Sequence, residues 1–329
     1  MRTAICVLAL SLSLVSCGGG GSSSSGSGSC NFQSGGNCSL NVNGVLRTYV
    51  LHVPSNLQSG ADALVIAFHG ANGSGSQFEG YTLLDQKADQ VGFAIAYPDG
   101  LPNSSGHTSW NGYFDPTYGS NPPDDTGFAQ QLIQTLVSNL HTNPKKVYVT
   151  GMSAGGYMAH RAAIDHPDLV AAAGVVEGSL TVQSAGGTQQ APAASGSVSI
   201  LILHGDADQV IHYCGVSNSS VVVTSQDQTF GYWYQTPANA CTSLNTSSNI
   251  CTAYLGSPTS LTLKDATGCN NGAEVRFYRL IGGTHNWYQV ALNVAPGTAA
   301  QPYNPNFNSS TGVTTNDILW NFFASHAKP

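Results

Sequence analysis

Short apolar runs alternate with amphipathic stretches along most of the chain. Runs in which nearly every side chain is apolar predict strands that are buried on both faces of a sheet. These runs lie at residues 63–68, 93–97, 146–150, 171–176 and 199–203. Residues 45–53 mix β-branched, aromatic and polar side chains, which is typical of an edge or half-buried strand, and residues 275–280 also predict a strand.

Amphipathic segments with helical spacing fill the gaps between these runs. They lie at residues 78–90, 128–140, 154–165 and 315–325. Asp124 or Asp125 is expected to cap the second of these helices. Residues 181–197 and 293–312 are rich in small or turn-forming residues and predict loops. The alternation favours an α/β fold, with a mainly parallel sheet covered by helices on both faces.

The N-terminal segment has the pattern of an export signal. Arg2 precedes a mostly apolar run at residues 4–14, which is shorter than the about 20 residues of a membrane span and fits a signal peptide. The run ends in Leu-Val-Ser before Cys17, which resembles the bacterial lipobox and implies lipidation of Cys17. An ordinary signal peptide cleaved nearby is the alternative.

The domain organisation follows from this start. We expect a signal peptide at residues 1–16, the lipidated Cys17 with a flexible Gly/Ser linker at residues 17–29, and a single α/β domain at residues 30–329. Such a protein is exported and is either anchored to the bacterial envelope or secreted. Gly18 stands where inner-membrane lipoproteins often carry Asp, and this resemblance favours the outer membrane.

The chain carries little charge. Only 8% of its 329 residues are charged, and the net charge is −7 at pH 7. Nucleic-acid recognition requires clustered Lys and Arg, so this balance argues against a nucleic-acid partner. The 41% of hydrophobic residues exclude a disordered chain. We expect a folded domain whose surface consists mainly of uncharged polar side chains.

Cysteine usage agrees with export. Two of the eight cysteines, Cys6 and Cys17, lie in the N-terminal signal. An even number then remains, which predicts three disulfides in an oxidising compartment without fixing their connectivity. These six are Cys30, Cys38, Cys214, Cys241, Cys251 and Cys269. The chain has no C-x-x-C pair, so we expect no zinc site of that kind.

Ser153 is the candidate nucleophile. It lies in G-M-S-A-G at residues 151–155, the single G-x-S-x-G match of the chain, between a predicted strand and a predicted helix. This strand–turn–helix setting is that of a nucleophile elbow, in which the hydroxyl is lifted clear of the backbone. A glycine-rich turn without chemistry is the alternative, but no lysine or second glycine of a phosphate-binding loop accompanies it.

A serine nucleophile needs a base and an acid that orients the base. His285, in the loop G-G-T-H at residues 282–285, is the candidate base. His204, His212 and His326 are its rivals. Asp206 and Asp208 follow the strand at residues 199–203, and the spacing does not decide between them. Together with His204 and His212 these aspartates also form a grouping that a metal would accept, which we regard as the weaker interpretation.

Two backbone N–H groups are needed to stabilise the oxyanion of an acyl-transfer reaction. One is expected from Ala154, which follows the nucleophile, and the other from the loop after the strand at residues 63–68. Ala71 is the candidate donor in that loop, with Gly70 as the second choice. His69 is expected to have a packing role.

Seven motifs, in order, resemble the single-domain esterases related to polyhydroxybutyrate depolymerases and feruloyl esterases. They are N-G-x-x-R-x-Y at 43–49, F-H-G at 68–70, Y-P-D-G at 97–100, D-D-x-G-F at 124–128, the elbow at 151–156, and the acid and base motifs at 204–213 and 282–287. The resemblance covers residues 41–324. It implies the α/β-hydrolase fold, ester hydrolysis without a cofactor, and Asp208 as the acid.

The same resemblance implies a Cys241–Cys269 disulfide, and proximity then suggests Cys30–Cys38 and Cys214–Cys251. The chain departs from the family pattern where His212 and Tyr288 replace prolines and where Ala154 replaces a common asparagine. These positions flank the acid, the base and the nucleophile. They leave the Ser153, His285 and Asp208 set intact, and the substrate preference of the family is not transferred to this chain.

The sequence therefore predicts an exported serine esterase that acts on an oligoester or on a feruloylated or acetylated polysaccharide fragment. Trp110 and Trp287 are candidates for the substrate pocket, with core packing as the alternative. No metal or cofactor is expected, and the membrane is a partner only through the lipid anchor. An acyltransferase that uses the same site, or a surface binding protein without catalysis, are the other functions considered.

Overall fold

The computed structural model describes residues 28–112, 122–180, 182–184, 191–217, 221–245, 260–289 and 314–329. The predictions for the signal peptide, Cys17, most of the linker, Cys251 and the loop at 293–312 lie outside these residues. None of the helices in the described part of the chain is long and apolar enough to cross a membrane.

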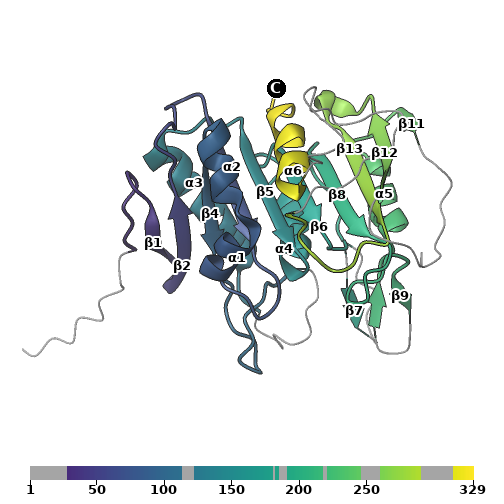
Figure 1. Ribbon diagram of the computed structural model, residues 1–329, viewed down its shortest axis with the longest axis horizontal. Coiled ribbons are helices and arrows are strands. Elements are labelled where there is room, and N and C mark those ends of the chain that lie inside the picture. Colours follow the sequence, from purple (N-terminus) through teal and green to yellow (C-terminus); the bar gives the residue numbers. More distant parts are fainter. Residues whose placement is uncertain are drawn as a thin grey trace, which may run out of the picture.

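A ten-stranded sheet forms the centre of the molecule (Figure 1). In sheet order the strands are β1 (Gly36–Val42), β2 (Val45–His52), β4 (Phe93–Pro98), β3 (Ala63–Phe68), β5 (Val147–Met152), β6 (Ala172–Val176), β8 (Ser199–Gly205), β13 (Val275–Ile281), β12 (Ser260–Thr267) and β11 (Ser243–Asn245). The strands from β4 to β13 are parallel, and antiparallel pairs extend both ends. The predicted mainly parallel sheet is confirmed.

Helices cover both faces of the sheet, because its central strands are apolar on both sides. Along β3, Leu64 and Ile66 belong to one core cluster, whereas Val65 and Ala67 belong to the other. The first cluster includes side chains of α3 (Asp125–Leu140), α4 (Ala154–Asp165) and α5 (Gln226–Gln235). The second includes side chains of α1 (Gly75–Thr82), α2 (Leu84–Val91) and α6 (Thr315–Ala324). Asp124 caps α3 by accepting the Gly127 N–H.

The structure corrects three details of the predicted elements. The helix expected at residues 78–90 is divided into α1 and α2 by Leu83, which has the left-handed backbone conformation (φ 53°). No strand was predicted for β1, which pairs with β2, the strand expected to be an edge or half-buried strand. The loop expected at residues 181–197 contains the short strand β7 (Val182–Ser184), which pairs with β10 (Val221–Val223) in a small second sheet with β9 (Val216–Ser217).

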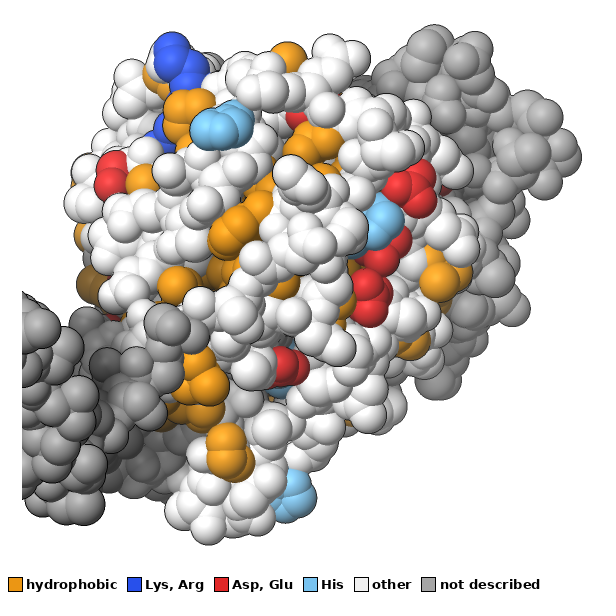
Figure 2. All heavy atoms as spheres, turned by 90° about the vertical axis from the view of Figure 1, so that its left-hand side faces the viewer, with side chains coloured by type: hydrophobic (Ala, Val, Ile, Leu, Met, Phe, Trp, Pro, Cys, Tyr) orange, Lys and Arg blue, Asp and Glu red, His pale blue; other side chains and the backbone are white. Residues whose placement is uncertain are grey.

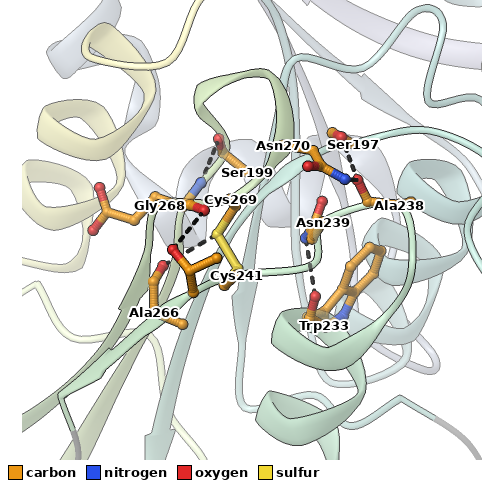
Figure 3. Close-up of a disulfide and its surroundings, with 12 residues drawn as sticks. Ser197, Ser199, Trp233, Ala238, Asn239, Cys241, Ala266, Gly268, Cys269 and Asn270 are labelled. Atoms are coloured by element: carbon orange, nitrogen blue, oxygen red, sulfur yellow. Dashed lines mark hydrogen bonds between the residues drawn. A yellow bond between two sulfur atoms is a disulfide. The ribbon is translucent and has the colours of Figure 1, made fainter.

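Two of the predicted disulfides are present. Cys30–Cys38 joins the segment before β1 to that strand, and Cys241–Cys269 joins the segment after α5 to the turn after β12. Figure 3 shows the second disulfide beside Asn270, whose side-chain amide donates to the Ala238 carbonyl (3.2 Å). The pairing of Cys214 with Cys251 stays a prediction, because Cys251 lies outside the described residues.

The surface agrees with the composition. On the side of the molecule seen in Figure 2, charged side chains are few, and several acidic ones gather beside a histidine at the right of the view, whereas most of the surface is backbone and uncharged polar side chains.

A buried ion pair joins the first strands to α3. The Arg47 guanidinium donates from Nη2 to Oδ1 of Asp125 (2.7 Å) and to the carbonyl of Asp99 (3.0 Å), and it lies over the Phe128 ring. The other oxygen of Asp125 accepts the Asn111 N–H (2.7 Å). Three motifs that are distant in sequence therefore converge on one buried charge pair.

We predict that Arg47→Met lowers the free energy of unfolding by about 3–5 kcal/mol, because the Asp125 carboxylate would lose its buried counter-ion. Urea denaturation measures this change. The control is Lys87→Met, which breaks a partly exposed pair with Asp317 and should cost less than about 1 kcal/mol. Equal losses in the two variants would contradict the prediction.

Candidate active site

Ser153 lies at a sharp turn between β5 and α4. Its backbone angles (φ 58°, ψ −122°) are unusual for a residue with a side chain, and such strain clusters at functional sites. The turn is packed so closely that a Cβ at Gly155 would lie 1.9 Å from the Phe68 carbonyl oxygen, and one at Gly151 would lie 2.2 Å from the Gly155 oxygen. Glycine is therefore required at both positions, as the elbow motif predicts.

His285 forms a hydrogen bond with Asp208. The distance from Nδ1 of His285 to Oδ2 of Asp208 is 2.7 Å. The Oδ1 atom of Asp208 accepts the backbone N–H groups of Val210 (2.7 Å) and Ile211 (2.9 Å). Burial by itself would raise the pKa of Asp208, but the hydrogen bond from His285, the two nearby imidazoles and the Val210 N–H lower it. This carboxylate is thus held in its charged form.

Asp206, the other candidate acid, has different contacts. It forms an ion pair with Arg279 (2.8 Å), and its Oδ1 accepts the Gly282 N–H (2.6 Å). It therefore anchors the turn that leads to His285.

The rival histidines are engaged elsewhere or exposed. His204 is buried, bonds through Nε2 to the Ile211 carbonyl (2.7 Å), and has its pKa lowered to about 4 by burial. His326 pairs with Glu274 (3.2 Å), and His212 is exposed. Of the four candidates, it is His285 that shares a cavity with Ser153.

That cavity has a volume of about 560 Å³ and is lined at one end by Ser153, His285, Gly70 and Ala71. Its apolar wall consists of Phe78, Tyr81, Met152 and Val210. The backbone of Gly70 lies close to Ser153, because a Cβ added to Gly70 would lie 3.6 Å from the Cβ of Ser153. Ala154 opens α4 directly after Ser153, and the first N–H groups of a helix have no partner within the helix. Both expected oxyanion donors therefore belong to segments that adjoin Ser153.

The two candidate tryptophans are in the core and do not line this cavity. Trp110 is 2% exposed, packs edge-on against Phe68 and donates from its indole to the His69 carbonyl (2.8 Å). Trp287 is 1% exposed and donates to Asn316 (2.8 Å). His69 accepts the Gly100 N–H at Nε2 (2.9 Å), so it fixes the loop from within, in agreement with the expected packing role.

Tyr81 was missed by the sequence reasoning. It lies on α1, donates from its hydroxyl to Oδ1 of Asn286 (2.5 Å) and accepts the Trp287 N–H (3.0 Å). It therefore ties α1 to the two residues that follow His285. No local pattern marks a helix tyrosine whose partners lie about 200 positions later.

Glu177 was also missed. It is fully buried at the end of β6, and one side-chain atom each of Glu177, Asp208 and His285 lie within 4.8 Å of one another. Such a set has the donor types of a metal site. The Nδ1 atom of His285, however, is already hydrogen-bonded to Asp208, so we treat these three side chains as a cluster of titratable groups.

Comparison with known proteins assigns the fold. Residues 47–226 match the family model described as esterase PHB depolymerase. The structure aligns with an acetyl xylan esterase from Aspergillus awamori at a TM-score of 0.51 and 20% identity, covering 77% of this chain and 94% of the other. The chain has the α/β-hydrolase fold, as the resemblance implied.

Two relatives illustrate the sequence similarity. A putative esterase NocK from Nocardia uniformis is 32% identical over 54% of this chain and 50% of its own length. A feruloyl esterase B from Piromyces equi is 27% identical over 73% of this chain and 42% of its own length. The chain thus spans about half the length of these relatives.

We predict that Tyr81→Phe lowers kcat for an ester such as p-nitrophenyl butyrate by about 2- to 10-fold, because the loop that carries His285 loses two of the hydrogen bonds that join it to α1. The phenyl ring still lines the cavity, so KM should stay within about twofold. Steady-state kinetics measure both values.

The matched control is Tyr232→Phe, which removes a hydroxyl that bonds to the Pro192 carbonyl, away from the cavity. If Tyr81→Phe and Tyr232→Phe have the same kcat, the proposed link has no role in positioning His285.

Proposed function

The chain belongs to the esterase PHB depolymerase family, and on that premise we propose that it is an exported serine esterase with Ser153, His285 and Asp208 as its catalytic residues. The observation that carries the proposal is the His285–Asp208 hydrogen bond at the wall of the cavity that contains Ser153. The strained elbow beneath Ser153 supports the same assignment.

In the proposed mechanism, Nε2 of His285 takes the hydroxyl proton of Ser153 while Oγ attacks the ester carbonyl. Asp208 fixes the imidazole with Nδ1–H toward the carboxylate and stabilises the imidazolium. The N–H groups of Ala154 and Ala71 bind the tetrahedral oxyanion, each contributing about 3 kcal/mol to the lowering of the barrier. His285 then protonates the departing alcohol, and water hydrolyses the acyl-enzyme by the reverse sequence of proton transfers.

We propose an oligoester or a feruloylated or acetylated polysaccharide fragment as the substrate. Relatives named as feruloyl esterase and acetylxylan esterase support this substrate class. The apolar wall formed by Phe78, Tyr81, Met152 and Val210 suits an acyl chain or an aromatic acid. The proposed chemistry requires no metal or cofactor.

We expect Ser153→Ala to lower kcat for p-nitrophenyl butyrate by on the order of 10⁶, and Asp208→Asn by on the order of 10⁴, because the first removes the nucleophile and the second leaves the imidazole in the wrong tautomer. The control is Asp89→Asn on the exposed side of α2, which should leave kcat unchanged. Activity retained by Ser153→Ala would refute the proposal. Acyl transfer to an added alcohol in preference to water would identify a transferase.

We also propose that Cys17 carries a lipid anchor and that the protein resides at the outer membrane. Cys17→Ser should move the protein from the membrane fraction to the soluble fraction, because the acyl chains hold it at the bilayer. Cys6→Ser, within the apolar run of the signal, is the control and should stay in the membrane fraction. A soluble wild-type protein would instead indicate ordinary secretion.

A further inference from the structure

Glu177 occupies a constrained position beside the proposed catalytic residues. It follows β6, which lies between β5, the strand before Ser153, and β8, the strand before Asp208. Its backbone is in the left-handed region (φ 47°), its N–H donates to the Leu203 carbonyl (2.9 Å), and its side chain is fully buried. A buried acidic side chain on a strained backbone, at the C-terminal end of a central strand, requires an explanation.

The contacts of Glu177 include no cation that would balance a charge. Its two oxygens share one backbone donor, the Gly205 N–H (3.1 and 3.0 Å). The nearest imidazole, that of His204, has Nδ1 at 3.6 Å from Oε2. Because Nε2 of His204 bonds to the Ile211 carbonyl, its proton is assigned there, and Nδ1 presents a lone pair toward Glu177. No Lys or Arg in the described part of the chain forms an ion pair with Glu177.

One side-chain oxygen of Glu177 lies within 4.8 Å of one side-chain oxygen of Asp208, and both side chains are buried. Two buried carboxyl groups this close strongly disfavour a second negative charge, so we infer that one of them holds a proton. Asp208 accepts two backbone N–H groups and the His285 N–H, whereas Glu177 accepts one backbone N–H. The charge therefore belongs on Asp208 and the proton on Glu177.

We propose that Glu177 is a neutral carboxylic acid that donates a hydrogen bond to Asp208 and thereby acts as a positioning residue for the Asp208–His285 pair. The inference rests on the proposed function, because it assigns Asp208 the role of orienting the base. The loop of Asp208 already holds its carboxylate through the N–H groups of Val210 and Ile211. The Glu177 side chain, which follows β6, restrains the same carboxylate from a second direction. It also spreads the Asp208 charge over a second carboxyl group.

The electrostatics of the surroundings agree with this assignment. Burial and the Asp208 charge raise the pKa of Glu177 well above its usual range, although the Gly205 N–H acts in the opposite direction. The other titratable groups that face the cluster are His204 from β8, Tyr157 from α4, and His285 and Tyr288 from the loop after β13. Burial holds both tyrosines neutral, with the pKa of Tyr288 raised to about 12. None of these groups supplies a fixed positive charge to an ionised Glu177.

Two variants of Glu177 separate a hydrogen-bond donor from a space-filling side chain. Glu177→Gln keeps an N–H donor for Asp208 and an oxygen acceptor for Gly205, so kcat should stay within about threefold of wild type. Glu177→Met keeps the length of the side chain but lacks the donor, so kcat should fall about 10- to 100-fold, as expected for the loss of one hydrogen bond to a charged group.

The pH dependence of kcat/KM gives a second readout. Its acid limb reports protonation of the base in the free enzyme. Replacing a neutral Glu177 by Gln changes no charge, so the acid limb should not move. In Glu177→Met the Asp208 charge loses its donor and attracts the imidazolium more strongly, so the acid limb should move to higher pH. Glu274→Gln, which removes a carboxyl group outside the cluster, is the control and should show neither change.

A direct measurement is the infrared difference spectrum between wild type and Glu177→Gln at pH 7. The proposal requires a protonated carboxyl C=O band that the variant lacks. Three results would overturn it: no such band, a Glu177→Gln variant as slow as Glu177→Met, or an acid limb that moves to lower pH in Glu177→Gln. If Glu177→Met does not fold, the kinetics of Glu177→Gln and the infrared spectrum still test whether Glu177 is protonated.

Failure of the proposed function gives a different pattern. In that case Ser153→Ala would retain its activity, whereas the infrared band would report the Glu177 proton independently of catalysis.

Discussion

The close contact between the backbone of the elbow and the strands on either side of it is the constraint on which the site depends. Gly155 touches the carbonyl of Phe68 at the end of β3, and Gly156 faces Gly178 just beyond β6, where an added Cβ would lie 2.9 Å from the Gly178 Cα. These contacts place Ser153 between two neighbouring loops. One loop carries Gly70 and Ala71, and the other carries Glu177.

The parallel sheet then brings the other side chains of the site to the C-terminal ends of its strands. Ser153, Glu177, Asp208 and His285 follow β5, β6, β8 and β13, which are consecutive in the sheet. Because parallel strands end on the same side, residues separated by more than 130 positions in sequence become neighbours. The apolar strands fix the positions of the strand ends, and the polar side chains beyond them carry the chemistry.

The loop that carries His285 is held from two sides. Asp206, itself paired with Arg279, binds the Gly282 N–H before the histidine, and Tyr81 binds the two residues after it. The imidazole thus receives its orientation from Asp208 while its backbone is fixed by unrelated contacts. An irregular loop acquires the precision of a secondary-structure element in this way.

The sequence by itself determined the fold and the elbow, because both depend on local patterns. Apolar runs of strand length predicted β3, β4, β5, β6 and β8, and the glycines around Ser153 predicted a turn that tolerates no side chain. Asp208 was distinguished from Asp206 only by resemblance to a family, since both follow the same strand. The tertiary structure decided which of them reaches His285, that Trp110 and Trp287 are core residues, and that Leu83 interrupts a helix.

Tertiary structure alone also brought Tyr81 and Glu177 to the site. Their partners are distant in sequence, and a helix tyrosine or a glutamate after a strand carries no local signature of function. Such contacts depend on the order of the strands in the sheet and on the face of the sheet along which each connecting loop runs. The periodicity and spacing of residues along the chain specify neither the strand order nor the path of the loops.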